Sequence, residues 1–187
     1  MTRRLGRDDW LDHALAQLAK GGAEALKLAP ICASAGVTRG SFYHHFNDHT
    51  AFLVAVAERW VSLSTDALIE RMPPDLDAAA RDALLTEFAM DIDFHAELGI
   101  RELARRIPAV TKVVRAADAK RLAFLAQIYA DRFKITSDQA MIAAKLEYAA
   151  YTGLILIDSE IDKTAQLNMS KTYGEMMQAY FGKGALE

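Results

Sequence analysis

Residues 28–46 read LAPICASAGVTRGSFYHHF, and this stretch predicts two short helices joined by a tight turn. Apolar residues recur at helical spacing over residues 28–35. Gly36 follows at once and can take the positive φ that a sharp turn requires. Thr38 can then accept hydrogen bonds from the free amides of a second helix over residues 39–45. This pattern is typical of a helix-turn-helix.

In a helix-turn-helix the second helix lies in the major groove of DNA, while flanking groups contact phosphates. Phe42 can anchor this helix from beneath. Arg39 can donate two hydrogen bonds to guanine or neutralise a phosphate, and the Tyr43 hydroxyl can reach a phosphate. The residues expected to face outward and contact DNA are Thr38, Arg39, Gly40, Ser41, Tyr43 and His44.

The run from Ile31 to Phe46 resembles the TetR family of bacterial transcriptional regulators, which includes the AcrR-like proteins. The resemblance rests on the Ala-Gly-Val turn, on the Phe-Tyr-x-x-Phe ending, and on a long helix after Asn47-Asp48-His49. In motif detail it covers roughly residues 8–60. It implies a repressor, usually a homodimer, that binds a pseudo-palindromic operator in double-stranded DNA. It also implies that a small-molecule effector in the larger domain lowers operator affinity.

Two positions depart from the usual family pattern where phosphate contacts are expected. Lys27 stands where threonine is common, and His49 stands where lysine is usual. We keep both as expected DNA contacts, supported by Arg3, Arg4 and Arg7. The chain as a whole carries a formal net charge of -3, which argues against a protein that coats nucleic acid by bulk attraction.

The rest of the chain predicts an all-α fold. We expect an N-terminal three-helix DNA-binding domain over residues 1–48, and a larger helical ligand-binding and dimerisation domain over residues 49–187. The first domain starts with an amphipathic helix near residues 8–19. Later helices are expected at about residues 49–72, 77–97, 100–106, 108–133, 137–157 and 164–181.

A ligand pocket is expected in the larger domain, because mostly apolar side chains with a few polar groups form such pockets. His95 shares a predicted helix face with Asp91 and can contribute a polar group, although a solvated helix end is the simpler interpretation. The expected lining residues are Met90, Phe94, His95, Leu103, Phe124, Tyr148 and Tyr151. The aromatic residues among them can equally be ordinary members of the hydrophobic core.

The last two predicted helices carry more apolar surface than one intramolecular face needs. Small residues such as Ala149 and Gly153 alternate there with Leu154, Met176 and Tyr180. This pattern favours a two-fold four-helix interface in a homodimer.

The composition and the motifs also argue against several classes of protein. Cys32 is the only cysteine, so a disulfide or a cysteine-rich zinc site within the chain is excluded. No signal peptide or membrane span is expected, so we predict a cytoplasmic protein without membrane contact. No catalytic motif is apparent, and neither an enzyme nor a cofactor is expected. The alternative function is a helical small-molecule-binding protein whose helix-turn-helix is structural only.

Overall fold

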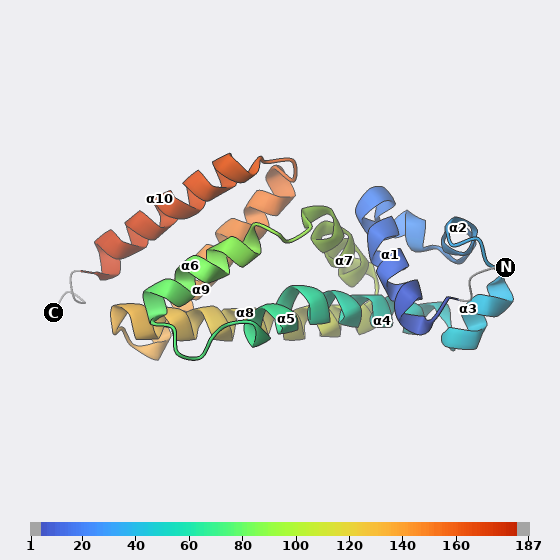
Figure 1. Cartoon of the computed structure of the whole chain (residues 1–187), viewed down its shortest axis with the longest axis horizontal. Coiled ribbons are helices and arrows are strands. Elements are labelled where there is room, and N and C mark those ends of the chain that lie inside the picture. The colour runs from blue at the N-terminus through green and yellow to red at the C-terminus, as the bar shows by residue number, and fades with distance from the viewer. Residues whose placement is uncertain (1–4, 183–187) are drawn as a thin grey trace. The chain divides into compact units, whose positions relative to one another are not determined.

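The computed structural model describes residues 5–182, and every regular element in that range is a helix (Figure 1). The expected all-α class is therefore confirmed. The helices of the first half are α1 (Arg7–Gly21), η1 (Gly22–Leu26), α2 (Leu28–Ser34), α3 (Arg39–His45), α4 (His49–Val61), η2 (Ser62–Asp66) and α5 (Ala67–Glu70). Those of the second half are α6 (Ala78–Ala89), α7 (Phe94–Arg106), α8 (Pro108–Phe133), α9 (Ser137–Ile157) and α10 (Lys163–Phe181).

The chain divides into two compact units. Unit 1 contains the residues up to Asp66 together with Asp93–Ala117, and unit 2 contains Ala67–Ile92 together with the residues from Asp118 onward. This division differs from the expected boundary after residue 48. The physical reason is that α4 and α7 pack against α1 and share its apolar core.

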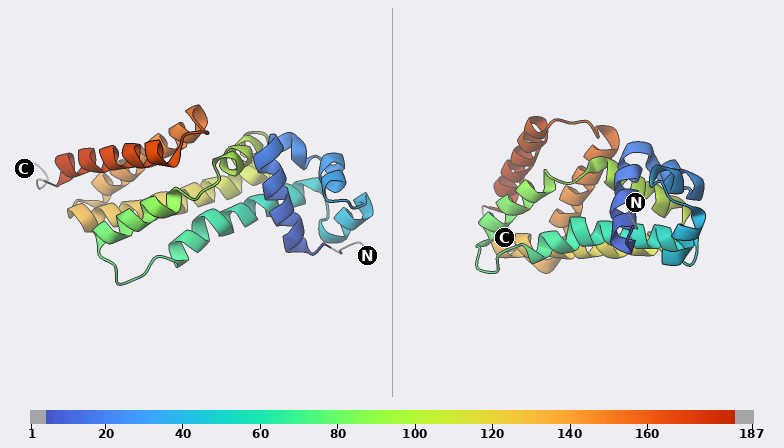
Figure 2. Two further views of the ribbon diagram at one scale, coloured as in Figure 1. Left: turned by 45° about the horizontal axis from the view of Figure 1, so that its top comes forward. Right: turned by 45° about the vertical axis from the view of Figure 1, so that its right-hand side comes forward.

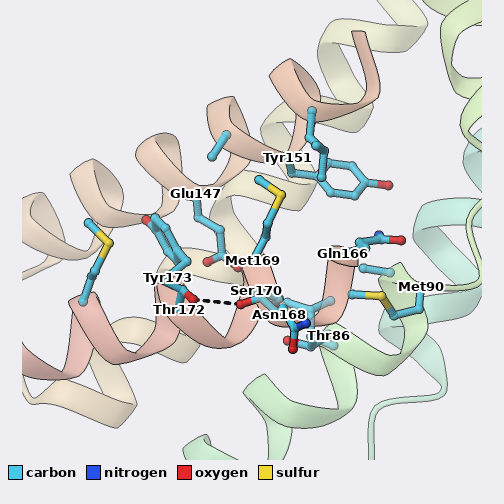
Figure 3. Close-up of a pocket in the computed structure, with 15 residues that line it drawn as sticks. Thr86, Met90, Glu147, Tyr151, Gln166, Asn168, Met169, Ser170, Thr172 and Tyr173 are labelled. Carbon is cyan, nitrogen blue, oxygen red and sulfur yellow. Dashed lines mark hydrogen bonds between the residues drawn. The ribbon is translucent and has the colours of Figure 1, made fainter. Parts of the chain in front are cut away.

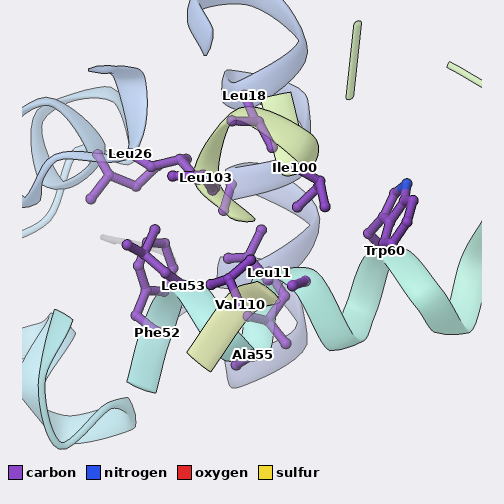
Figure 4. Close-up of a cluster of buried hydrophobic side chains, with 14 of the residues drawn as sticks. Leu11, Leu18, Leu26, Phe52, Leu53, Ala55, Trp60, Ile100, Leu103 and Val110 are labelled. Carbon is purple, nitrogen blue, oxygen red and sulfur yellow. The ribbon is translucent and has the colours of Figure 1, made fainter. Parts of the chain in front are cut away.

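The core of unit 1 is built from side chains of α1, α4, α7 and the start of α8 (Figure 4). Trp10 and Phe52 are fully buried there, and so are Leu18 and Ile100. Helix α1 lies across α4 in both views of Figure 2. An ion pair also joins these two helices, with Arg59 Nε 2.8 Å from Asp12 Oδ1.

Helix α7 approaches α1 closely because Gly99 faces Leu18. A Cβ atom at position 99 would lie 2.5 Å from Leu18 Cγ, which is closer than real contacts allow. Gly99 therefore permits the short distance between the two helices, and this contact holds α1 against α7.

Unit 2 has its own apolar core between α8, α9 and α10. Small residues of α9 are fully buried there, which lets the helices pack closely. The buried members of this core are Leu125, Ala126, Tyr129, Phe133, Ile135, Ala140, Ala143, Ala144, Met177 and Phe181.

Three expected helices were wrong in their bounds. The helix expected at 77–97 ends at Ala89, and a new helix starts at Phe94 because the Asp93 carboxylate accepts hydrogen bonds from the backbone amides of His95 and Ala96. The helix expected at 100–106 therefore starts six residues earlier than expected. The helix expected at 49–72 is interrupted by a π-helical turn over Ser62–Asp66. The other expected helices lie within about two residues of the observed ones.

One helix, Ser137–Ile157, is long and apolar enough to cross a membrane by length and composition alone. Within unit 2 its small residues Ala140, Ala143 and Ala144 pack into the core. One such helix is weak evidence for a membrane span, because core helices of proteins that never meet a membrane pass the same test; 28% of the apolar window of α9 is buried.

Candidate DNA-binding surface and ligand pocket

The turn between α2 and α3 depends on one glycine. Gly36 has a φ of +66°, which non-glycine residues adopt only at a cost. Its amide donates to the Ala33 carbonyl at 3.1 Å, and the Val37 amide donates to the Cys32 carbonyl at 3.0 Å. These two bonds satisfy carbonyls at the end of α2 and turn the chain into α3.

The start of α3 is set by Thr38. Its backbone is extended, and its hydroxyl oxygen accepts a hydrogen bond from the Ser41 amide at 3.4 Å. The expected cap and the expected bounds of this helix, residues 39–45, are both confirmed. The cap fixes where the exposed side chains of α3 begin.

One face of α3 is buried and the other is exposed. Phe42 is fully buried, and its ring contacts Trp10, Phe46 and Phe52 at centroid distances of 5.2–5.7 Å. We call these four rings the aromatic cluster. On the opposite face Tyr43 is 53% exposed. The expected DNA contacts Thr38, Arg39, Gly40 and His44 are exposed as well, and Ser41 is half-buried.

Positive charge lies beside this exposed face. The guanidinium of Arg7 sits over the Phe46 ring, 5.6 Å from its centroid, and Arg7 is exposed. Lys27 precedes α2 and is exposed, with its ammonium group 2.5 Å from the Glu24 carboxylate. Arg3 and Arg4, also expected to contact phosphates, lie outside the described residues.

His49 has a structural contact in addition to its expected role. Its Nε2 donates to the Leu26 carbonyl at 2.7 Å, and the residue is half-buried. This bond ties the start of α4 to the end of η1, next to Lys27. The carbonyl can only accept, so the proton lies on Nε2.

Unit 2 contains a pocket of about 450 Å³ between α6, α9 and α10 (Figure 3). Most of its wall is apolar, and its polar side chains include the carboxylate of Glu147, the amides of Gln166 and Asn168, and several hydroxyl groups. The full lining is Leu85, Thr86, Ala89, Met90, Glu147, Ala150, Tyr151, Leu154, Gln166, Asn168, Met169, Ser170, Thr172, Tyr173 and Met176. The expected lining residues Met90 and Tyr151 are among them.

Glu147 is the charged residue of this lining. The Tyr129 hydroxyl donates to its Oε2, and Figure 3 shows its side chain near Tyr173 and Met169. Burial raises the pKa of Glu147 to about 7, although the hydrogen bond from Tyr129 acts in the opposite direction. Burial and the nearby Glu147 carboxylate raise the pKa of Tyr173 to about 12.

Five of the expected ligand-binding residues do not line this pocket. Phe94, His95 and Leu103 belong to α7 in unit 1, where Phe94 and Leu103 are buried. Phe124 and Tyr148 belong to unit 2 but lie outside the lining. Their roles as ligand contacts remain predictions.

Two of these residues have polar contacts of their own. The Tyr148 hydroxyl donates to Asp118 Oδ1 at 2.6 Å and accepts from Arg121 at 3.1 Å. The expected pairing of His95 with Asp91 on one helix face does not occur, because the chain leaves the helix between them. Asp91 instead pairs with Lys163 at 2.9 Å.

Glu147, Gln166 and Tyr173 are pocket residues that the sequence did not single out. A signal for Glu147 exists, since it is an acidic residue four positions before Tyr151 on an otherwise apolar helix face. Gln166 is 6% exposed, yet nothing in its sequence neighbourhood distinguishes it from a solvated residue. Over residues 5–182, no group of three or more histidine, cysteine, aspartate or glutamate side chains is arranged to hold a metal ion.

Comparison with known proteins agrees with the geometry of unit 1. Residues 11–56 match the model of the bacterial regulatory proteins, tetR family. This range contains all of α2 and α3 and most of α1 and α4. None of the curated protein sequences compared with the chain matches it.

Solved structures with the same fold match nearly the whole chain. A transcriptional regulator from Rhodococcus sp. Rha1 has a TM-score of 0.80 at 15% identity, covering 94% of this chain and 97% of its own. A putative transcriptional regulator from Saccharomonospora viridis, solved in complex with choline, has a TM-score of 0.78 at 16% identity, covering 92% and 95%. Salmonella enterica GusR has a TM-score of 0.73 at 19% identity, covering 94% and 95%. At these identities the likeness shows the fold.

Proposed function

We propose that the chain is a repressor of the tetR family that binds a pseudo-palindromic operator as a homodimer, and the match of residues 11–56 to the model of that family supports this proposal. The observation that carries the proposal is that α3 has one buried face and one exposed face. Its buried face rests on the aromatic cluster, and its exposed face presents Arg39, Tyr43 and His44. A helix held in this way can enter a major groove without rearranging.

The alanine variant of Arg39 tests this assignment. Operator fragments are first selected from the source genome with the purified protein, and affinities are then measured by fluorescence anisotropy. A lost bidentate arginine contact costs about 1–3 kcal/mol, so we expect Arg39→Ala to bind the operator roughly 5- to 150-fold more weakly. Tyr43→Phe removes only a hydroxyl and should weaken binding less.

Arg106→Ala is the matched control, because Arg106 is an exposed arginine of unit 1 paired with Glu102. It should bind the operator like the wild type. If Arg39→Ala and Tyr43→Phe both bind the operator as tightly as the wild type does, α3 is not part of the DNA interface. Binding that is neither salt-dependent nor sequence-specific would instead favour a helical small-molecule-binding protein with a structural helix-turn-helix.

The dimer in this proposal is formed through α9 and α10. Exposed apolar side chains line both helices, and we call them the exposed stripe: Ile142, Leu146, Leu156, Ile157, Leu167, Met169, Met176 and Tyr180. A Cβ atom at Gly153 or at Gly174 would meet nothing within 4 Å, so a second helix has room to approach there. One short recognition helix reads few base pairs, so pairing two copies also supplies the specificity.

Leu156→Asp tests the dimer. Leu156 is 74% exposed, so the substitution removes few contacts within the chain but places a charge in the proposed interface of both copies. We expect the dimer dissociation constant to rise at least about 100-fold, measured by analytical ultracentrifugation. Leu63→Asp is the control, since Leu63 is 50% exposed and lies in unit 1. Equal assembly of both variants would exclude the exposed stripe as the interface.

In the same proposal the pocket of unit 2 binds the effector. Its volume and mostly apolar wall suit a small organic molecule, and the regulator from Saccharomonospora viridis with the same fold was solved with choline. An effector lowers operator affinity only if it binds more tightly to a conformation that holds the two recognition helices at another spacing. The cytoplasm, where the chromosome lies, is the place of action.

A further inference from the structure

We propose that the effector pocket takes a monovalent organic cation with apolar substituents, held by the carboxylate of Glu147 and the rings of Tyr151 and Tyr173. This inference deepens the proposed function and rests on it. It is carried by the chemistry of the pocket wall.

The charge of the pocket wall favours a cationic ligand. Its fifteen residues include one carboxylate, Glu147, and none of them is lysine, arginine or histidine. A buried carboxylate is costly to ionise unless a cation compensates it. An anionic ligand would meet repulsion here, and a neutral ligand would leave the carboxyl group protonated or uncompensated, whereas a cation stabilises its ionised form.

Side chains behind the pocket neutralise one another and leave Glu147 without a cation of its own. Arg132 of α8 forms an ion pair with Asp82 of α6. Glu147 is bonded to the neutral hydroxyl of Tyr129. Arg132 is close enough to lower the pKa of Glu147, but Asp82 raises the same pKa. The Arg132–Asp82 ion pair therefore compensates little of the negative charge of Glu147. One negative charge is thus left for a ligand to balance.

The pocket wall also contains two aromatic rings. Tyr151 lies one helical turn beyond Glu147 on α9, and Tyr173 approaches from α10 (Figure 3). The faces of tyrosine rings attract organic cations, most strongly where water is excluded. Met169 and Met176 are flexible apolar side chains that can adapt to alkyl groups. A carboxylate, two aromatic rings and apolar walls together match a substituted ammonium ion.

The probe is (3-hydroxyphenyl)trimethylammonium, and its neutral isostere is 3-tert-butylphenol, in which carbon replaces the charged nitrogen. Calorimetry on the full-length protein without DNA compares the two at pH 7, where the phenol groups of both compounds are mostly protonated. We expect the cation to bind at least about tenfold more tightly than the phenol. This comparison needs no variant, so it does not depend on how a substitution folds.

Glu147→Gln keeps the size of the side chain and removes its charge. It should abolish the preference for the cation while retaining binding of the phenol. Glu175→Gln is the matched control, because Glu175 is an exposed residue of α10 outside the lining, and it should keep the wild-type preference. The proposal would be overturned if the wild-type protein bound the phenol as tightly as the cation, or if it bound neither. It would also be overturned if Glu147→Gln kept the wild-type preference for the cation.

The pH dependence supplies a further readout. The groups that face Glu147 are Tyr129 and Arg132 from α8, Asp82 from α6 and Tyr173 from α10. The carboxylate has a pKa of about 7 and must be ionised to hold a cation. The affinity for phenyltrimethylammonium, whose charge does not change with pH, should therefore rise as the pH rises from 6 to 8, by up to roughly tenfold, with release of a proton. The Glu147→Gln variant should show no such rise.

These measurements separate the two proposals. Because they use the free protein, failure of cation binding leaves operator binding untouched. If the cation binds with the expected preference but does not release the operator, the ligand site stands and its regulatory role fails.

Discussion

Phe42→Ala is expected to lower the free energy of unfolding by about 3–5 kcal/mol. The ring is fully buried and holds α3 to the aromatic cluster, with Trp10 at 5.7 Å and Phe52 at 5.2 Å between centroids. Its removal leaves a cavity that the neighbouring rings cannot fill, because each is fixed by its own contacts. Chemical denaturation followed by tryptophan fluorescence measures the loss, since Trp10 reports directly on this cluster.

Tyr43→Ala is the matched control for this variant. Tyr43 is the next residue on α3 and carries a ring of similar size, but it is 53% exposed. It should cost no more than about 1 kcal/mol, mostly through its edge contact with Phe42 at 5.3 Å. Equal losses in the two variants would show that burial of Phe42 does not hold α3 in place.

The helix-turn-helix was predictable because its signals are local. Gly36 has the positive φ expected of it, and Thr38 caps α3 as predicted. Each signal acts on residues within four positions of itself, so neighbouring sequence contains the whole cause. The match of residues 11–56 falls on this same part of the chain.

The break before α7 was missed because two signals compete there. Apolar residues continue at helical spacing across residues 88–94, which favours one long helix. Asp93, however, accepts hydrogen bonds from two amides and starts a new helix. An aspartate inside a periodic pattern can be an exposed helix residue or a cap, and periodicity alone does not separate the two.

The pocket was predicted less well because it depends on which helices meet. Met90 and Tyr151 line it, whereas Phe94 and Leu103 are buried in unit 1. All four are apolar or aromatic residues of predicted helices, so the sequence pattern does not distinguish pocket residues from core residues. Glu147 was overlooked for the opposite reason, because a glutamate on a helix usually faces water.

The second large effect is expected at a buried ion pair in α7. The Glu97 carboxylate is fully buried, and Arg101 lies one turn later with its Nε and its terminal guanidinium nitrogen 2.8 and 2.7 Å from Glu97 Oε1. Arg101→Met keeps an apolar stem of similar length but leaves the carboxylate without this partner. Breaking a buried pair from one side costs about 3–5 kcal/mol, and chemical denaturation should show a loss of that size.

Arg106→Met on the same helix is the matched control. Arg106 also pairs with a glutamate four residues earlier, Glu102, but both side chains are largely exposed. Exposed pairs of this kind contribute at most about 1 kcal/mol, so this variant should unfold nearly like the wild type. The Glu97→Met, Arg101→Met double variant should recover much of the loss, because it removes the buried charge as well. A double variant less stable than Arg101→Met would mean that Glu97 stabilises unit 1 through contacts other than this pair.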